Sequence, residues 1–142
     1  MNTNKAIWFS RHQPSPEQIE DAKRLGFDLA VIPEGTALGA MNLNDDGDTK
    51  AVVTALLGIC SKTDAKAIFG VFPTPILCQI HRTAQDAVQR GQNTPQGDGI
   101  GDVPCFASWN VQRSQEGGKP TFHHKAWLPI GHLSQASLRW LP

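Results

Sequence analysis

The chain contains several short polar stretches whose side chains are suited to contacting a phosphate group. The first is Ser10-Arg11-His12-Gln13, which places a hydroxyl, a guanidinium, an imidazole and an amide side by side. This stretch leads into a helix predicted to begin at Pro16, and helix N-termini attract anions. Its four residues are therefore candidate ligand contacts. The alternative is that Ser10 ends a strand and that Arg11 and His12 are solvated loop residues.

A second stretch, Gly70-Val71-Phe72-Pro73-Thr74, also joins a predicted strand to a predicted helix. Glycine lets a ligand approach the backbone closely, and a threonine hydroxyl beside a helix N-terminus can contact a phosphate. Gly70, Phe72 and Thr74 are therefore further candidate ligand-binding residues. The simpler interpretation of Thr74 is a helix cap.

A third stretch runs from Ser108 to Arg113. Trp109 offers a plane on which a base could stack, while Ser108, Asn110 and Arg113 offer a hydroxyl, an amide and a guanidinium that can bind a phosphate. Trp109 could equally fill the core or a dimer interface.

Two histidines and a lysine, His123-His124-Lys125, lie on the last predicted strand. Because side chains alternate along a strand, His123 and His124 should point to opposite faces, so that at most one serves the site. His124 is the candidate acid or base. Adjacent strand positions do not converge on one metal ion, and no cysteine pair accompanies them, so we expect no metal site.

The hydrophobic pattern predicts alternating strands and helices. Strands are expected at residues 6–10, 27–32, 65–72, 103–111 and 121–128, and helices at 16–25, at 49–61 and from Thr74 to about residue 90. Ser15 and Gln18 form a predicted capping box, and Asp48 is the expected cap of the second helix. Residues 35–48 are expected to be a connection, 91–102 a flexible loop and 129–142 a tail.

This order predicts an α/β fold, namely a Rossmann-like three-layer sandwich whose mainly parallel sheet carries a C-terminal β-hairpin. Ligands of open parallel sheets bind beyond the carboxyl ends of the strands. The three polar stretches after the first, third and fourth strands should therefore meet at one edge of the sheet.

Composition narrows the class of ligand. A chain of 142 residues forms one domain, and 13 Lys plus Arg balance 13 Asp plus Glu. A neutral protein does not attract long DNA or RNA, so a compact polyanion is the better ligand. The apolar runs are short, which predicts neither a membrane span nor a signal peptide and hence a cytoplasmic protein. The three cysteines are far apart and predict small buried residues rather than disulfides.

Several cofactor motifs do not fit the sequence. Gly97, Gly99 and Gly101 lack the dinucleotide-binding spacing and precede a strand rather than follow one. The acidic run from Asp45 to Asp48 has Val53 where a calcium loop needs a bidentate glutamate. No Gly-x-x-x-x-Gly-Lys phosphate-binding loop is present. We therefore expect no cofactor.

Several short segments, taken in their order along the chain, resemble the small ring nucleases of type III CRISPR systems, which are minimal CARF-like proteins. The resemblance rests on Phe9-Ser10-Arg11-His12, the run from Ser15 to Gly26, Ile32-Pro33-Glu34, Gly70 with Phe72 and Thr74, Pro104-x-Phe106-Ala107-Ser108, Arg113, and Phe122-x-His124. It implies a homodimer that binds a cyclic oligoadenylate, commonly cyclic tetra-adenylate, across its two-fold axis.

The resemblance also implies metal-independent ring opening that ends antiviral signalling. In that reaction a ribose 2′-hydroxyl attacks the adjacent phosphorus and leaves a linear product with a 2′,3′-cyclic phosphate. Arg11 and Arg113 would stabilise the developing charge, and His12 or His124 would act as acid or base. Two alternatives remain open: a protein that binds the messenger without cutting it, and a small protein-interaction module without a nucleotide ligand.

Overall fold

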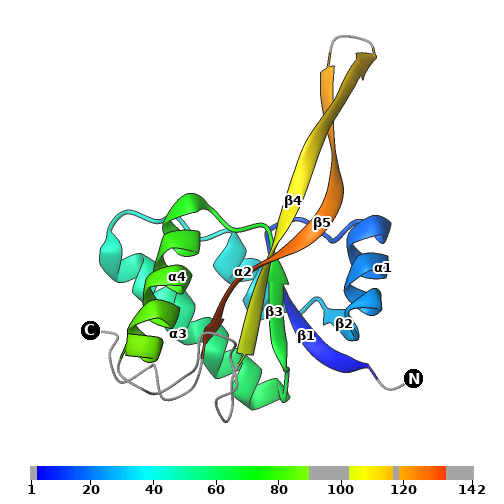
Figure 1. The fold of residues 1–142 in the computed structure, drawn as a ribbon. Helices are drawn as coiled ribbons and strands as arrows, with labels where there is room; N and C mark the ends of the chain where they lie inside the picture. The colour runs from blue at the N-terminus through cyan, green and yellow to red at the C-terminus, as the bar shows by residue number, and fades with distance from the viewer. Residues whose placement is uncertain (1–2, 90–102, 117–118, 134–142) are drawn as a thin grey trace.

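Strands and helices alternate along most of the chain, which ends in two long strands (Figure 1). The computed structural model describes residues 3–89, 103–116 and 119–133. The elements are β1 (Asn4–Phe9), α1 (Pro16–Arg24), β2 (Phe27–Ala30), α2 (Pro33–Gly39), α3 (Asp46–Thr63), β3 (Ala67–Gly70), α4 (Thr74–Gln89), β4 (Val103–Glu116) and β5 (Lys119–Leu133).

The described strands form one five-stranded sheet with the order β2-β1-β3-β4-β5. The pairs β1–β2, β1–β3 and β3–β4 are parallel, and β4–β5 is antiparallel. The predicted α/β class, the mainly parallel sheet and the C-terminal hairpin are thus confirmed. The arrangement is compatible with a Rossmann-like sandwich.

The start of α1 follows directly from its sequence. The Ser15 hydroxyl accepts a hydrogen bond from the Gln18 amide at 3.2 Å, and Gln18 Oε1 accepts one from the Ser15 amide at 2.8 Å. These two bonds satisfy amide groups that have no partner within the helix. The predicted capping box is confirmed, and it also fixes how the Gln18 side chain is oriented.

The segment between β2 and α3 differs from the prediction in two respects. Residues 33–39, expected to lie in a connection, form the short helix α2, with Pro33 in its first turn. Helix α3 begins earlier than expected, and its cap is Asp45, whose side chain accepts a bond from the Asp48 amide at 3.0 Å. The prediction of Asp48 as the cap was wrong, because Asp48 lies inside the first turn, where its side chain accepts a bond from the Asn44 amide at 2.8 Å.

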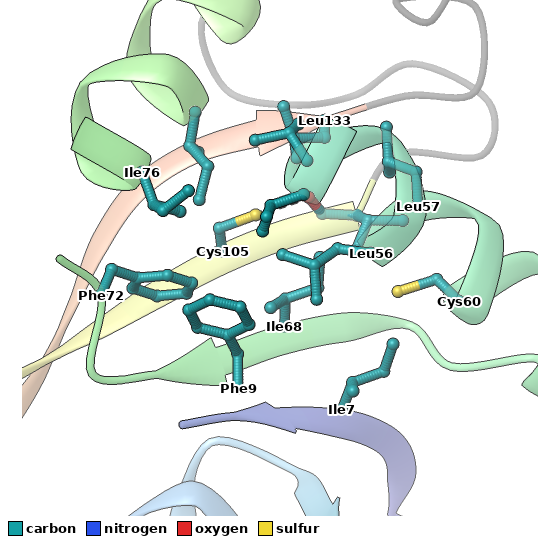
Figure 2. Close-up of a cluster of buried hydrophobic side chains, with 14 of the residues drawn as sticks. Ile7, Phe9, Leu56, Leu57, Cys60, Ile68, Phe72, Ile76, Cys105 and Leu133 are labelled. Carbon is teal, nitrogen blue, oxygen red and sulfur yellow. Dashed lines mark hydrogen bonds between the residues drawn. The ribbon is translucent and has the colours of Figure 1, made fainter. Parts of the chain in front are cut away.

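Helices cover both faces of the sheet, and each face has its own hydrophobic core. One core packs α1, through Ala22, against aromatic side chains that include Trp8, Phe69 and Trp127. The other packs α3 and α4 against the opposite face of the sheet (Figure 2). The chain therefore forms three layers, with α1 alone on its side among the described helices.

The cysteines follow the prediction only in part. Cys60 and Cys105 are buried in the core of α3 and α4 (Figure 2), whereas Cys78 on α4 is exposed. Burial raises the pKa of the Cys60 thiol to about 12 and raises that of Cys105 further, because the thiolate form is poorly solvated there. Cys78 is therefore the accessible thiol of the three.

The terminal hairpin extends well beyond the rest of the sheet (Figure 1). Residues 129–133, predicted to begin an uncertain tail, continue β5 as far as Leu133. Residues 134–142, and the predicted flexible loop at 91–102, lie outside the described residues. Within the described part of the chain, no helix combines the length and apolarity that a membrane crossing requires.

Candidate functional site

The register of the parallel strands brings the three polar stretches to one edge. Phe9 of β1 lies beside Gly70 of β3, which in turn lies beside Ala107 of β4. The residues that follow these partners, Ser10, Val71 and Ser108, therefore stand next to one another where the parallel strands end. This is the carboxyl edge at which open α/β sheets bind ligands.

The loop after β1 is held by two hydrogen bonds. The Ser10 hydroxyl is buried and accepts a bond from the His12 amide at 3.1 Å, while the Trp8 indole donates to the His12 carbonyl at 2.7 Å. Arg11, His12 and Gln13 are exposed. The backbone of the loop is thus fixed, and its guanidinium, imidazole and amide groups face solvent at the carboxyl edge.

Gly70, at the end of β3, and Phe72, just after it, have structural roles. A Cβ atom added to Gly70 would lie 2.2 Å from the Phe9 carbonyl oxygen, so this glycine permits the close approach of β1 and β3. Phe72 is buried, and its ring stacks on Phe9 with centroids 5.1 Å apart. Thr74 is exposed in the first turn of α4, where the Pro73 carbonyl accepts bonds from the amides of residues 76 and 77.

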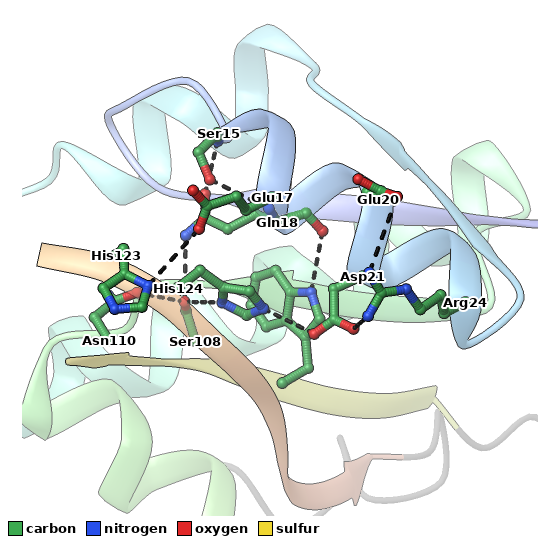
Figure 3. A network of polar contacts seen from close by, with 11 residues as sticks. Ser15, Glu17, Gln18, Glu20, Asp21, Arg24, Ser108, Asn110, His123 and His124 are labelled. Carbon is green, nitrogen blue, oxygen red and sulfur yellow. Dashed lines mark hydrogen bonds and ion pairs between the residues drawn. The ribbon is translucent and has the colours of Figure 1, made fainter.

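A buried histidine joins the hairpin to α1 (Figure 3). His124 of β5 has a side chain that is 3% exposed. Its Nδ1 lies 2.7 Å from the Ser108 hydroxyl of β4, and its Nε2 lies 2.9 Å from Asp21 Oδ2 of α1. Three side chains from three elements thus form a continuous hydrogen-bonded chain at the base of the hairpin.

The partners of His124 fix its hydrogen-bonding pattern. An ionised carboxylate only accepts hydrogen bonds, so Nε2 carries a proton and donates to Asp21. In the neutral ring Nδ1 then has a free lone pair and accepts from the Ser108 hydroxyl. Gln18 Nε2 also donates to that hydroxyl at 3.2 Å. Ser108 is therefore held between a donor on α1 and an acceptor on β5.

Asn110 provides a second acceptor for the same hydroxyl. Its Oδ1 lies 2.9 Å from the Ser108 oxygen, within reach of the serine proton when that proton is not donated to His124 Nδ1. When His124 carries both protons, Nδ1 donates to Ser108 and the serine proton turns to Asn110. The Ser108 hydroxyl therefore has an acceptor in either protonation state of the ring.

The second histidine of the pair also reaches α1, although strand alternation predicts that the two side chains point to opposite faces. His123 Nδ1 lies 3.9 Å from Glu17 Oε2, so His123 and His124 both contact this helix (Figure 3). Helix α1 contacts both edge strands of the sheet, β2 and β5.

Trp109 and Arg113 are not part of the histidine cluster. Trp109 is 42% exposed, and the centroid of its ring lies 4.2 Å from Lys125 Nζ. Arg113 lies in β4, but its side chain is outside the described part of the structure.

A small polar hollow of about 200 Å³ opens beside the cluster. It is lined by residues of α1 and β5, namely Glu17, Glu20, Asp21, Arg24, His124 and Lys125. Arg24 lies 3.5 Å from Asp21 Oδ1, on the carboxylate that holds His124. Within residues 3–89, 103–116 and 119–133, no group of three or more His, Cys, Asp or Glu side chains is placed to hold a metal ion.

Of the predicted site residues, the structure brings Ser108, Asn110 and His124 into contact. It adds Asp21 and Gln18, which the sequence analysis treated only as helix residues. Both lie three residues apart on one face of α1, and this spacing is the one signal in the sequence that they share a neighbour.

The comparisons with known proteins give no match: neither a protein-family model nor a curated protein sequence matches this chain.

Proposed function

We propose that the protein binds a cyclic oligoadenylate at the carboxyl edge of its sheet and opens the ring without a metal ion. The observation that carries this proposal is the hydrogen-bonded chain Asp21–His124–Ser108 at that edge. A general base held by a carboxylate, next to a hydroxyl, is suited to removing a proton from a ribose 2′-hydroxyl. The resemblance to CARF-like ring nucleases supplies the class of ligand.

In this proposal each group has a defined task. The 2′-hydroxyl oxygen bonds to the adjacent phosphorus, the bond from phosphorus to the 5′-oxygen breaks, and a 2′,3′-cyclic phosphate remains. Since His124 is almost enclosed, the ligand meets Ser108, which accepts the 2′-hydroxyl proton and passes its own to Nδ1. Exposed Arg11 stabilises the phosphorane charge, and exposed His12 can protonate the departing oxygen.

The symmetry of the ligand supports a homodimer. A cyclic tetra-adenylate ring has a two-fold axis, and an isologous dimer presents the same loops to both halves. Two copies of the Ser10–Gln13 loop would supply two guanidinium groups to four phosphates. The exposed Trp109 and Lys125 pair of each copy offers a ring face and an ammonium for a base or a phosphate.

A second candidate is a protein that binds the messenger without cutting it. The observation that favours it is the burial of His124, whose ring nitrogens both already have protein partners. Such a cluster could serve only to hold the hairpin against α1.

The test combines binding with turnover. The purified chain is incubated with cyclic tri-, tetra- and hexa-adenylate in the presence of EDTA, ring opening is followed by chromatography, and binding is measured by calorimetry in parallel. The proposal expects a linear product with a 2′,3′-cyclic phosphate from one of the rings. Binding without product supports the second candidate, and no binding to any ring contradicts both and leaves a protein-interaction module.

A further inference from the structure

We propose that Ser108 is a base-activated nucleophile that reacts with electrophilic phosphorus. This inference goes beyond ring opening by a ribose hydroxyl, because it needs no 2′-hydroxyl in the substrate. It rests on the side-chain geometry around Ser108, and its test is independent of the test of the proposed function.

The arrangement has the three parts of an activated serine. The nucleophile and its base lie within hydrogen-bond reach, Ser108 Oγ to His124 Nδ1 at 2.7 Å, and a third group orients the base, Asp21 to Nε2 at 2.9 Å. Serine hydrolases use the same three residue types with the serine on Nε2 and the aspartate on Nδ1. Here the two ring nitrogens are exchanged, which leaves the direction of proton transfer unchanged.

Burial makes this chain of bonds effective. The His124 side chain is 3% exposed and the Asp21 side chain 23% exposed, so water competes little for their contact. The Trp127 ring packs against the imidazole, with centroids 4.7 Å apart and ring planes tilted by 49°, and helps to hold the imidazole in place. Ser108 itself is only partly buried, so its hydroxyl is the member of the chain that a reagent can reach.

Gln18 supplies a polar group at the reacting atom. Because Gln18 Oε1 is engaged by the Ser15 amide, its Nε2 must point to Ser108, where it donates at 3.2 Å. A donor fixed beside the serine oxygen is positioned to stabilise negative charge that develops there or on an adjacent phosphoryl oxygen. The capping box of α1 therefore fixes the orientation of the Gln18 side chain beside Ser108.

The reaction balances without any further reactant. The Ser108 oxygen forms a bond to phosphorus while the bond from phosphorus to its leaving group breaks and the leaving group departs with the electron pair. The serine proton moves to His124 Nδ1, and Asp21 accepts the hydrogen bond of Nε2–H throughout. Asp21 acts through His124 and is a positioning residue.

The test uses a fluorophosphonate probe on the full chain. Attack by Ser108 on the probe releases fluoride and adds one phosphonyl group, which intact mass spectrometry counts and peptide mapping locates. We expect a single adduct, on Ser108. Ser108→Ala should abolish it, His124→Gln should slow it at least about 100-fold, and Asp21→Asn should slow it at least about tenfold.

Matched controls separate this role from a structural one. Ser61→Ala removes an exposed serine of α3, and Glu34→Gln removes an exposed carboxylate from the first turn of α2; both variants should label at the wild-type rate. Nitrogen-15 shifts of the His124 ring should show the Nε2–H tautomer in the wild-type chain and a mixture of tautomers in Asp21→Asn.

The outcomes distinguish the two proposals. Labelling of Ser108 without ring opening keeps this inference and contradicts the proposed function. Ring opening without labelling of Ser108 supports the proposed function and contradicts this inference. An unlabelled Ser108 in the folded wild-type chain overturns the inference whatever the variants do.

Discussion

The Ser108 hydroxyl oxygen lies 2.7 Å from Nδ1 of His124, across the two strands of the terminal hairpin. This contact stands where β4 leaves the parallel sheet and begins its long extension. Asp21 and Gln18 of α1 complete it from the side, so one short helix both covers the sheet and orders the polar cluster. The position of α1 therefore determines which hydrogen-bond partners Ser108 and His124 have on that side.

Removal of the exposed guanidinium of Arg11 should weaken ligand binding. If Arg11 contacts a phosphate, Arg11→Ala should raise the Kd for the cyclic oligoadenylate about tenfold or more, since a charge-assisted hydrogen bond contributes about 1.5–3 kcal/mol. Calorimetry measures the change. Lys62→Ala, which removes an equal charge from the last turn of α3, should leave the Kd unchanged; an equal loss in both variants would indicate a general charge effect.

Phe72 should matter for stability rather than for ligand contact. Its ring is buried and stacks on Phe9, so Phe72→Ala leaves a cavity and should lower the free energy of unfolding by about 3–5 kcal/mol. Urea denaturation measures this loss. A Kd that stays within about twofold of wild type would assign Phe72 to the core alone, whereas a large rise in a folded variant would restore it as a ligand contact.

Two glycines should respond in opposite ways to the same substitution. Gly70→Ala places a methyl group 2.2 Å from the Phe9 carbonyl oxygen and should cost about 3 kcal/mol or more. Gly58 lies within α3 with nothing within 4 Å of an added Cβ, so Gly58→Ala should stabilise the chain by about 0.5–1 kcal/mol. Thermal melts of both variants give the two signs, and equal shifts would contradict the packing described for β1 and β3.

The three thiols should differ in reactivity. In the folded chain iodoacetamide at neutral pH should modify Cys78 and spare Cys60 and Cys105, because burial raises the pKa of both core thiols and so keeps them protonated. Raising the pH to about 9 stays below the Cys60 value of about 12 and should not add a second label. Mass spectrometry counts the adducts, with urea-unfolded protein as the three-label reference.

The sequence predicted the strands and the longer helices better than the connections between them. The capping box at Ser15, the strands and the hairpin follow from local patterns, and the structure confirms them. Helix α2 was missed because residues 35–39 have no apolar period, so only Pro33 and Glu34 indicate a helix start. The helical signal in these residues was too weak to distinguish a short helix from a loop.

The candidate site was predictable only in part, for a geometric reason. Ser108 and His124 could be named because both belong to the hairpin and face the expected ligand edge. Asp21 is 103 residues away from His124 in the chain. Their contact depends on the packing of α1 against β5 and on a register shift between Trp109 and Asn110. Neither the packing nor the register shift can be recognised from a local pattern of residue types.

The most direct test of the account compares ring opening by the wild-type chain with that by His124→Gln, with EDTA present and binding measured alongside. His81→Gln, an exposed histidine of α4 on the other face of the sheet, is the matched control. The account predicts a loss of rate of about 100-fold or more in His124→Gln, with ligand still bound and the control unaffected. Ring opening at the wild-type rate in a folded His124→Gln protein would contradict it.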